Sequence, residues 1–142
     1  MSIEMYQSPI LVTVAYTALY FAMITYGLRV RMRLYRAHKA RGERFDRYFN
    51  EDRGLLAADR MQLNMLEQMP VFLIGLWMHA VFVSPSAAGI AGWVYVACRA
   101  AYPFLLGKQL GKTIPFRIFY ATMPAYGVLI YLYGGLIWAL MG

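Results

Sequence analysis

Hydrophobic residues fall into four long runs along the chain, separated by shorter polar connections. We expect membrane-spanning helices at about residues 6–30, 56–83, 87–106 and 115–141. Each run can cross a hydrocarbon core about 30 Å thick, because a helix rises about 1.5 Å per residue. The pattern therefore predicts an all-α integral membrane protein. It would be a four-transmembrane-helix bundle formed by one domain over residues 1–142.

The connections between the runs differ in charge. Residues 31–55 form a basic loop, residues 83–89 (VSPSAAG) an uncharged turn, and residues 107–115 (GKQLGKTIP) a short basic loop. All 14 Lys and Arg residues lie in the two basic loops, in the adjoining helix ends or, for Arg99, within the third run. Basic loops stay on the cytoplasmic side of a membrane. We therefore expect a multi-pass protein with its N- and C-termini on the non-cytoplasmic side.

Composition supports a membrane protein and narrows its chemistry. The 142 residues are 61% hydrophobic, with a mean hydropathy of +0.46, which is too apolar for an ordinary soluble domain. The placement of the basic residues explains the net charge of +7 without nucleic acid, and it favours contact with membrane lipids. The single cysteine, Cys98, excludes an intrachain disulfide framework and a cysteine-cluster metal site, so no metal is expected.

Polar residues interrupt the second and third runs at helical spacing. Arg60, Asn64 and Glu67 are spaced i, i+4, i+7 and share one helix face, and Arg99 and Tyr102 share another. Ionisable residues at membrane depth are costly and usually face the bundle interior for a functional reason. The second run leaves the cytoplasmic side and the third returns to it, so the two polar faces should lie at similar depth.

Two interpretations of these polar faces remain open. One is an internal salt bridge, for instance between Glu67 and Arg99, which only fixes helix packing. The other starts from the excess of arginine, which includes Arg29 and Arg31 at the end of the first run. Arginine is suited to bidentate capture of carboxylates. This surplus predicts a small anionic ligand at the cytoplasmic end of the bundle.

Three further polar residues lie in the second run. Gln62 is two residues from Arg60 and points to roughly the opposite face. An amide there suits a second interface, as if the helix were shared between subunits. The alternative is that Gln62 lies near the lipid headgroups and is hydrated. Gln68 can line the site beside Glu67. His79 lies toward the outer end of the run, where an interfacial or packed histidine is expected.

These residues together form a recognisable motif. The second run contains R-x-Q-x-N-x-x-E-x-x-P, formed by Arg60, Gln62, Asn64, Glu67 and Pro70. This pattern resembles the second-helix signature of the MAPEG family, the membrane-associated proteins in eicosanoid and glutathione metabolism. The R-x-x-Y of Arg99 and Tyr102 resembles the third-helix motif of that family. The chain length, the four runs and the basic first loop are also similar, as in the microsomal glutathione S-transferases.

The resemblance implies a homotrimer that binds glutathione between neighbouring subunits near the cytoplasmic face. The candidate glutathione-binding residues are then Arg29, Arg31, Arg60, Gln62, Asn64, Glu67, Gln68, Arg99 and Tyr102. By this analogy Gln62 reaches the peptide from the next subunit, and Arg29 or Arg31 closes the site. Glutathione carries two carboxylates and one ammonium, which matches several arginines beside one glutamate.

The resemblance also implies a glutathione transferase or peroxidase that acts on hydrophobic electrophiles or lipid hydroperoxides. A thiol with a pKa of about 8.5 needs a nearby cation to become a thiolate at neutral pH. Arg117 and Tyr102 are the catalytic candidates, although Arg117 equally suits an anchor for the fourth run. Leukotriene synthase-type members carry a second Tyr and an activating Arg where this chain has Leu106 and Thr113. The alternative is a non-catalytic MAPEG-like protein that binds a lipid or a partner membrane protein.

Overall fold

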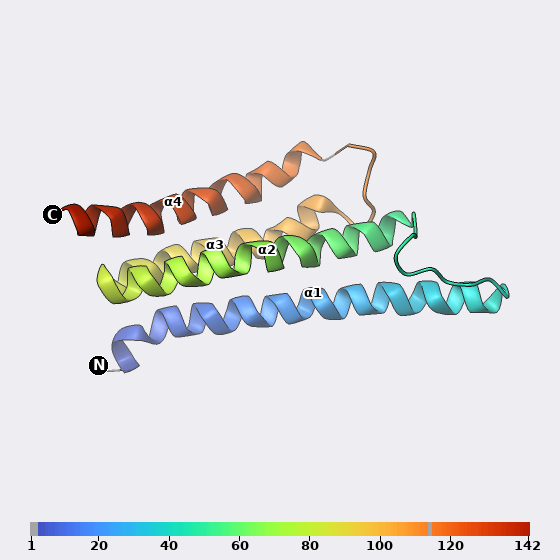
Figure 1. The fold of residues 1–142 in the computed structure, drawn as a ribbon, viewed down its shortest axis with the longest axis horizontal. Helices are drawn as coiled ribbons and strands as arrows, with labels where there is room; N and C mark the ends of the chain where they lie inside the picture. The colour runs from blue at the N-terminus through green and yellow to red at the C-terminus, as the bar shows by residue number, and fades with distance from the viewer. Residues whose placement is uncertain (1–2, 114) are drawn as a thin grey trace.

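Four long antiparallel helices form the computed structural model, which describes residues 3–113 and 115–142. The elements in chain order are η1 (Ile3–Tyr6), α1 (Gln7–Ala40), α2 (Arg53–Phe82), α3 (Pro85–Leu106), η2 (Phe116–Ile118) and α4 (Phe119–Met141). The 3-10 helix η1 and the C-terminal end of α4 lie at one end of the bundle (Figure 1). The connections after α1 and α3 lie at the opposite end, which we call the basic end.

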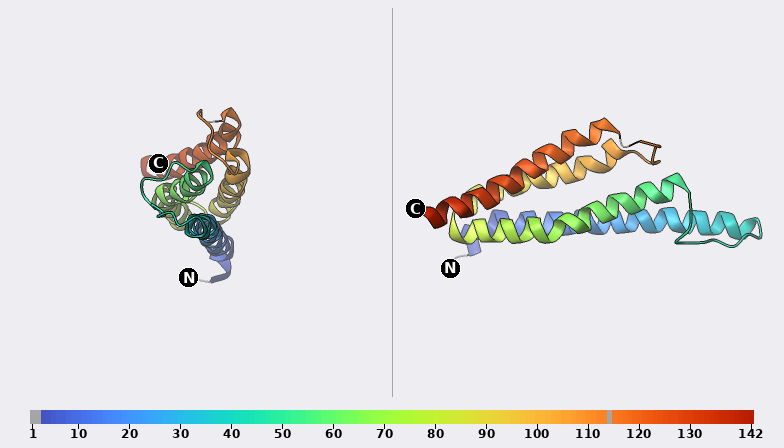
Figure 2. Two further views of the ribbon diagram at one scale, coloured as in Figure 1. Left: turned by 90° about the vertical axis from the view of Figure 1, so that its right-hand side faces the viewer. Right: turned by 45° about the horizontal axis from the view of Figure 1, so that its top comes forward.

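The central pair of the bundle is α2 and α3, each of which packs against the other three helices. On opposite sides of this pair lie α1 and α4 (Figures 1 and 2). Four helical stretches are long and apolar enough to cross a membrane: Ile3–Ala40, Arg53–Phe82, Pro85–Leu106 and Phe116–Met141. The prediction of an all-α four-helix bundle with four candidate spans is therefore confirmed. The side of the membrane on which each end lies stays a prediction.

The first helix is longer than the apolar run that predicted it. Because α1 continues to Ala40, residues 31–40 of the expected basic loop are helical. The charges at Arg29 and beyond mark the end of the apolar run, but Arg, Met, Leu, Lys and Ala are all strong helix formers. The chain leaves the helix at Gly42, whose φ of 71° lies in the left-handed region that glycine tolerates best.

The starts of α2 and α3 are fixed by side-chain caps. An oxygen of Asp52 accepts a hydrogen bond from the backbone N–H of Leu55 at 2.8 Å. The hydroxyl of Ser84 accepts one from Ala87 at 3.2 Å, and Pro85 follows it at the first helical position. Both caps satisfy N–H groups that have no partner within the helix. The polar residues of α2 are therefore set at a defined distance from its start.

An aromatic cluster joins α1, α2 and α3, further from the basic end than the polar residues of α2. The rings of Phe72 and Tyr95 stack with their centroids 3.9 Å apart, and the ring of Tyr16 lies 5.1 Å from that of Phe72. All three side chains are fully buried, and the Tyr16 hydroxyl donates a hydrogen bond to the Met65 carbonyl at 2.7 Å. The cluster fixes the register between α2 and α3. Tyr95 lies one turn before Arg99, so this register also positions the arginine.

Candidate functional site

The predicted polar face of α2 is present, and its residues differ in burial. Arg60 and Glu67 are exposed on the outer side of the helix, whereas Asn64 between them is half-buried. Of these three, only Asn64 hydrogen-bonds to another helix within the described part of the chain. The single chain therefore presents two charged side chains of the motif, Arg60 and Glu67, on its surface.

Arg99 of α3 is the partner of Asn64. Its Nη1 donates a hydrogen bond of 2.6 Å to the Asn64 Oδ1, and its guanidinium carbon lies 5.0 Å from the centre of the Tyr95 ring. The side chain is only 2% exposed, yet its Nε and Nη2 have no hydrogen-bond partner among the residues described. The salt bridge between Glu67 and Arg99, the example given for the packing interpretation, is wrong because Glu67 is exposed and Arg99 hydrogen-bonds to Asn64 instead.

Gln68 belongs to a second group of polar contacts, next to Arg99. Its amide nitrogen donates to the Tyr126 hydroxyl of α4 at 3.3 Å, and its carbonyl oxygen accepts from the Tyr95 hydroxyl at 3.5 Å. Three helices thus meet at one amide. Tyr126 had no signal in the sequence, because its place depends on how α4 packs against α2.

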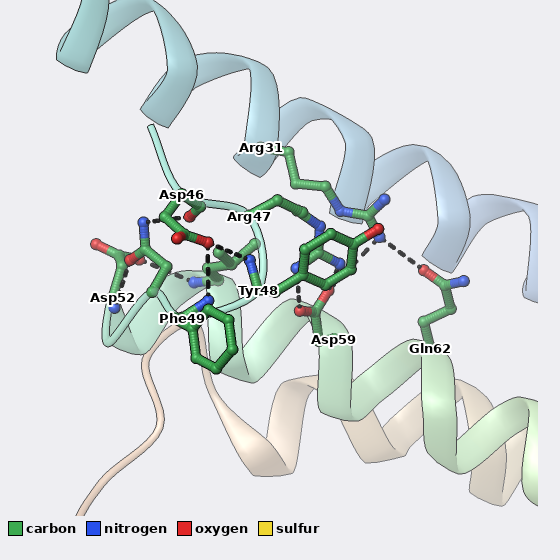
Figure 3. Close-up of polar contacts among 10 residues, drawn as sticks. Arg31, Asp46, Arg47, Tyr48, Phe49, Asp52, Asp59 and Gln62 are labelled. Atoms are coloured by element: carbon green, nitrogen blue, oxygen red, sulfur yellow. Dashed lines mark hydrogen bonds and ion pairs between the residues drawn. The ribbon is translucent and has the colours of Figure 1, made fainter. Parts of the chain in front are cut away.

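A third group joins α1, α2 and the connection between them. Arg31 Nη2 donates to the Gln62 Oε1 at 3.1 Å and lies 3.5 Å from the Asp59 Oδ1. Arg47 of the connection reaches both Asp59 oxygens, at 3.0 and 3.1 Å (Figure 3). Gln62 is therefore bound to an arginine of the same chain, and it lines the same hollow as Arg60 rather than an opposite face.

These residues line a hollow of about 460 Å³ on the outer side of α2. Its polar lining consists of Arg31, Arg47, Asp59, Arg60 and Gln62, and leucines complete it. Three arginines face one carboxylate here, so the hollow has an excess of positive charge. An anion with carboxylate groups suits such a lining.

The connection that supplies Arg47 has a defined turn. The Asp46 Oδ1 accepts hydrogen bonds from the backbone N–H groups of Tyr48 at 2.8 Å and Phe49 at 3.0 Å (Figure 3). These N–H groups, that of Phe49 most strongly, hold the pKa of the Asp46 carboxyl below its usual value. The turn is therefore favoured at neutral pH and presents the next side chain, Arg47, to Asp59.

The two catalytic candidates lie where α3 and α4 meet. Tyr102 is buried in an apolar cluster with Met61 and Ile118. Arg117 is exposed, and its Nε donates to the Leu105 carbonyl near the end of α3 at 2.6 Å. Such a bond satisfies one of the last helix carbonyls, and the cation also suits the negative end of the helix dipole. Within the chain Arg117 therefore caps α3.

Arg29 and Arg31 take up different positions, although both were candidates to close the site. Arg31 joins Asp59 and Gln62, while Arg29 lines a separate hollow beside Lys108. Residues two apart on a helix face away from each other, which explains the separation. Of the two, Arg31 is the one that lies with the α2 motif.

Comparison with known proteins assigns the chain. The MAPEG family pattern matches residues 9–138, which covers nearly the whole sequence and all four helices. The chain belongs to the MAPEG family. The resemblance drawn from the second-helix and third-helix motifs is thereby confirmed. Many members of this family of integral membrane proteins are glutathione-dependent enzymes.

A relative of this MAPEG protein occurs in Synechocystis sp., where it is named uncharacterized protein sll1147. The two are 44% identical over 43 residues, which is 30% of this chain and 31% of that protein. The alignment thus spans less than a third of the relative, and its name assigns no activity. The similarity supports no more than a shared stretch of sequence.

Asp59 and Arg47 line the hollow beside the α2 motif, and the sequence analysis did not name them. Asp59 directly precedes the motif, and its role depends on the turn that brings Arg47 back to α2. The one available signal was that Asp59 is an acidic residue directly before Arg60, at the start of a mainly apolar run. A turn of this kind cannot be recognised from hydropathy alone.

Proposed function

We propose that this MAPEG protein binds glutathione between the subunits of a homotrimer. It uses the thiol to conjugate hydrophobic electrophiles or to reduce lipid hydroperoxides. The observation that carries the proposal is Arg99, a buried guanidinium whose Nε and Nη2 have no hydrogen-bond partner and which forms no ion pair among the described residues.

A buried charge without a counter-ion is strongly destabilising, often by about 3–5 kcal/mol. A carboxylate of glutathione would be the missing counter-ion, and its oxygens would accept hydrogen bonds from the free N–H groups of Arg99. The carbonyl oxygen of Asn64 accepts the hydrogen bond from Arg99. The amide N–H₂ of Asn64 is therefore left to donate to the same ligand. Arg99 and Asn64 together thus form a carboxylate-binding pair.

The second half of the proposed site comes from a neighbouring subunit. Arg60 and Glu67 are exposed in one chain, and charged side chains on a membrane helix face protein or water rather than lipid. A neighbour that covers this side of α2 brings its own Arg31 and Gln62 toward the motif. Glu67 then accepts the glutathione ammonium, and the arginines bind its carboxylates.

The proposed reaction uses the sulfur as a thiolate. For conjugation, the thiolate forms a C–S bond with the electrophilic carbon while the leaving group departs with its electron pair. For a hydroperoxide, two glutathione molecules are oxidised to the disulfide while the O–O bond is reduced to alcohol and water. Arg117 supplies the nearby cation, provided that the neighbouring subunit brings the sulfur to the end of α3.

A second candidate is a non-catalytic MAPEG protein that binds a lipid or a partner membrane protein. It is favoured by one observation, namely that Arg117 donates its Nε to the Leu105 carbonyl and so has a structural role already. Tyr102 is likewise buried among apolar side chains. In this case the protein still binds an anion at Arg99 and Asn64 but does not activate a glutathione thiol.

The test is to measure glutathione binding to the purified protein in detergent. Calorimetry gives the affinity, and the ultraviolet absorbance of the thiolate shows whether the thiol is ionised. Arg60→Ala removes a motif residue. Arg44→Ala removes an exposed arginine that lies in the connection after α1 and has no ion pair among the described residues. We expect Arg60→Ala to lose binding and Arg44→Ala to retain it.

The outcomes separate the two functions. Binding with a thiolate signal, together with turnover of a chlorinated dinitrobenzene or an organic hydroperoxide, supports the enzyme. Binding without a thiolate signal and without turnover favours the non-catalytic protein. Absence of binding at millimolar glutathione would rule out the proposed function.

A further inference from the structure

A second cationic hollow lies on the other side of α1 from Arg31. It has a volume of about 470 Å³, and Arg29 and Arg33 of α1 meet Lys108 from the connection after α3 in its lining. Asp52 also lines it, but one oxygen of this side chain already caps α2. The hollow therefore has more positive than negative charge.

The three cations of this hollow are not used within the chain. Arg29, Arg33 and Lys108 are all exposed, and none of them forms an ion pair with the residues that the structure describes. They come from two elements far apart in sequence and converge on one space. Their positive charge is thus available to an external anion.

An apolar hollow adjoins the cationic one. It has a volume of about 300 Å³ and shares Tyr26 and Lys108 with its neighbour. Its other lining includes Met23 of α1 and Pro103 and Phe104 of α3, with Phe104 84% exposed. Together the two hollows form one groove between α1 and α3, with a cationic part and an apolar part.

The order of the two parts follows the direction of the helices. Along α1, Met23 and Tyr26 precede Arg29 and Arg33, so the apolar part lies deeper in the bundle. The cationic part lies at the basic end. In a membrane this places cations at the headgroup level and apolar side chains beside the acyl chains.

We propose that this groove between α1 and α3 binds one anionic phospholipid. The phosphate lies among Arg29, Arg33 and Lys108, and an acyl chain lies along Met23, Tyr26 and Phe104. A soluble anion leaves the apolar part unused, and a zwitterionic lipid lacks the net charge that three cations favour. The bound lipid links α1 to the end of α3 on the side away from the glutathione motif.

The experiment is native mass spectrometry of the whole protein in a non-ionic detergent, titrated with phosphatidylglycerol or phosphatidylcholine of the same acyl chains. Arg33→Gln/Lys108→Gln removes two groove cations, neither of which belongs to the candidate glutathione site. Lys39→Gln/Arg44→Gln removes two exposed cations that do not line the groove. Circular dichroism checks that each variant is folded.

We expect one phosphatidylglycerol per chain to bind more tightly than phosphatidylcholine. The groove double variant should weaken this binding at least tenfold, because each cation near the surface contributes about a fivefold effect. The control double variant should stay within about twofold of the wild type. Arg33→Lys/Lys108→Arg should retain binding, and Phe104→Gln should weaken it while all the cations remain.

Four results would each overturn the proposal. Equal loss in the two double variants would indicate general attraction to a basic surface. Displacement of the lipid by millimolar glycerol phosphate would indicate a phosphate site rather than a lipid site. Equal binding of phosphatidylcholine, or an unchanged affinity in Phe104→Gln, would remove the cationic or the apolar half of the argument.

Discussion

At the scale of single residues, Arg99 depends on the shape of its side chain as well as on its charge. The planar guanidinium lies near the Tyr95 ring and donates one N–H to Asn64, which leaves its Nε and Nη2 without a partner and in fixed directions. A lysine at this position retains the charge but presents a flexible ammonium without that fork. The substitution thus separates charge from geometry.

We expect Arg99→Lys to weaken glutathione binding about tenfold or more, because the bidentate contact to a carboxylate is lost. The bundle should remain folded, since the aromatic cluster below it is unchanged. Isothermal titration in detergent measures the affinity, and the exposed Arg44→Lys serves as the control. Wild-type affinity in Arg99→Lys would show that the ligand does not contact this side chain.

Asp59 is a second residue with an effect beyond its own position. It holds Arg47 through two hydrogen bonds and also lies within ion-pair distance of Arg31. Removing its charge leaves the connection after α1 tied to α2 by weaker contacts. Each of these partly exposed ion pairs contributes about 0.2–1 kcal/mol, so the effect should be local.

We expect Asp59→Asn to speed amide hydrogen exchange in residues 44–49 several-fold without a measurable loss of global stability. Glu43→Gln is the matched control, because Glu43 pairs with Arg41 on the exposed side of the same connection. Mass spectrometry of peptides from this region measures the rates. If both variants exchange alike, Asp59 does not hold the connection.

At the scale of the elements, close contact between helices rests on small residues. Gly92 of α3 faces the junction with α1 and α2, where a Cβ would lie 2.7 Å from the Val12 Cγ1 and 2.9 Å from the Leu76 Cδ1. Both of these neighbours are fully buried and cannot move freely. Gly134 of α4, by contrast, has no atom within 4 Å of such a Cβ.

We expect Gly92→Ala to lower the free energy of unfolding by about 1–2 kcal/mol, since overpacking outweighs the gain in helix propensity. Gly134→Ala should be neutral or stabilising by up to about 1 kcal/mol. Unfolding in mixed detergent micelles, followed by circular dichroism, compares the two variants. Equal effects would mean that the junction relaxes to accept a methyl group.

The elements were predictable from hydropathy because a membrane demands long apolar helices. The end of α1 was less so, because hydropathy marks the edge of the apolar run and not the end of the helix, which continues to Ala40. The spacing of Arg60, Asn64 and Glu67 was enough to mark them as candidates. Asp59 and Arg47 were not marked, since their contact depends on a turn between the helices.

At the scale of the whole molecule, the outer side of α2 is unusual for a surface in contact with lipid. Leu63, Leu66 and Ile74 are exposed there and could face acyl chains. Arg60 and Glu67 are exposed on the same helix and do not suit that environment. Burial of this surface against other copies of the chain removes the conflict, and it also brings the two halves of the proposed glutathione site together.

This arrangement predicts which positions lie near their counterparts in other subunits. In a Cys98→Ser background, Leu66→Cys on α2 should form covalent dimers with a short bis-maleimide, whereas Val94→Cys on α3 should stay monomeric. The two side chains are both 46% exposed in the single chain, so accessibility does not favour either. Denaturing electrophoresis after cross-linking in membranes gives the result. Cross-linking at Val94→Cys alone would place the subunit contact on α3, and it would separate Arg60 and Glu67 from any neighbour able to complete the glutathione site.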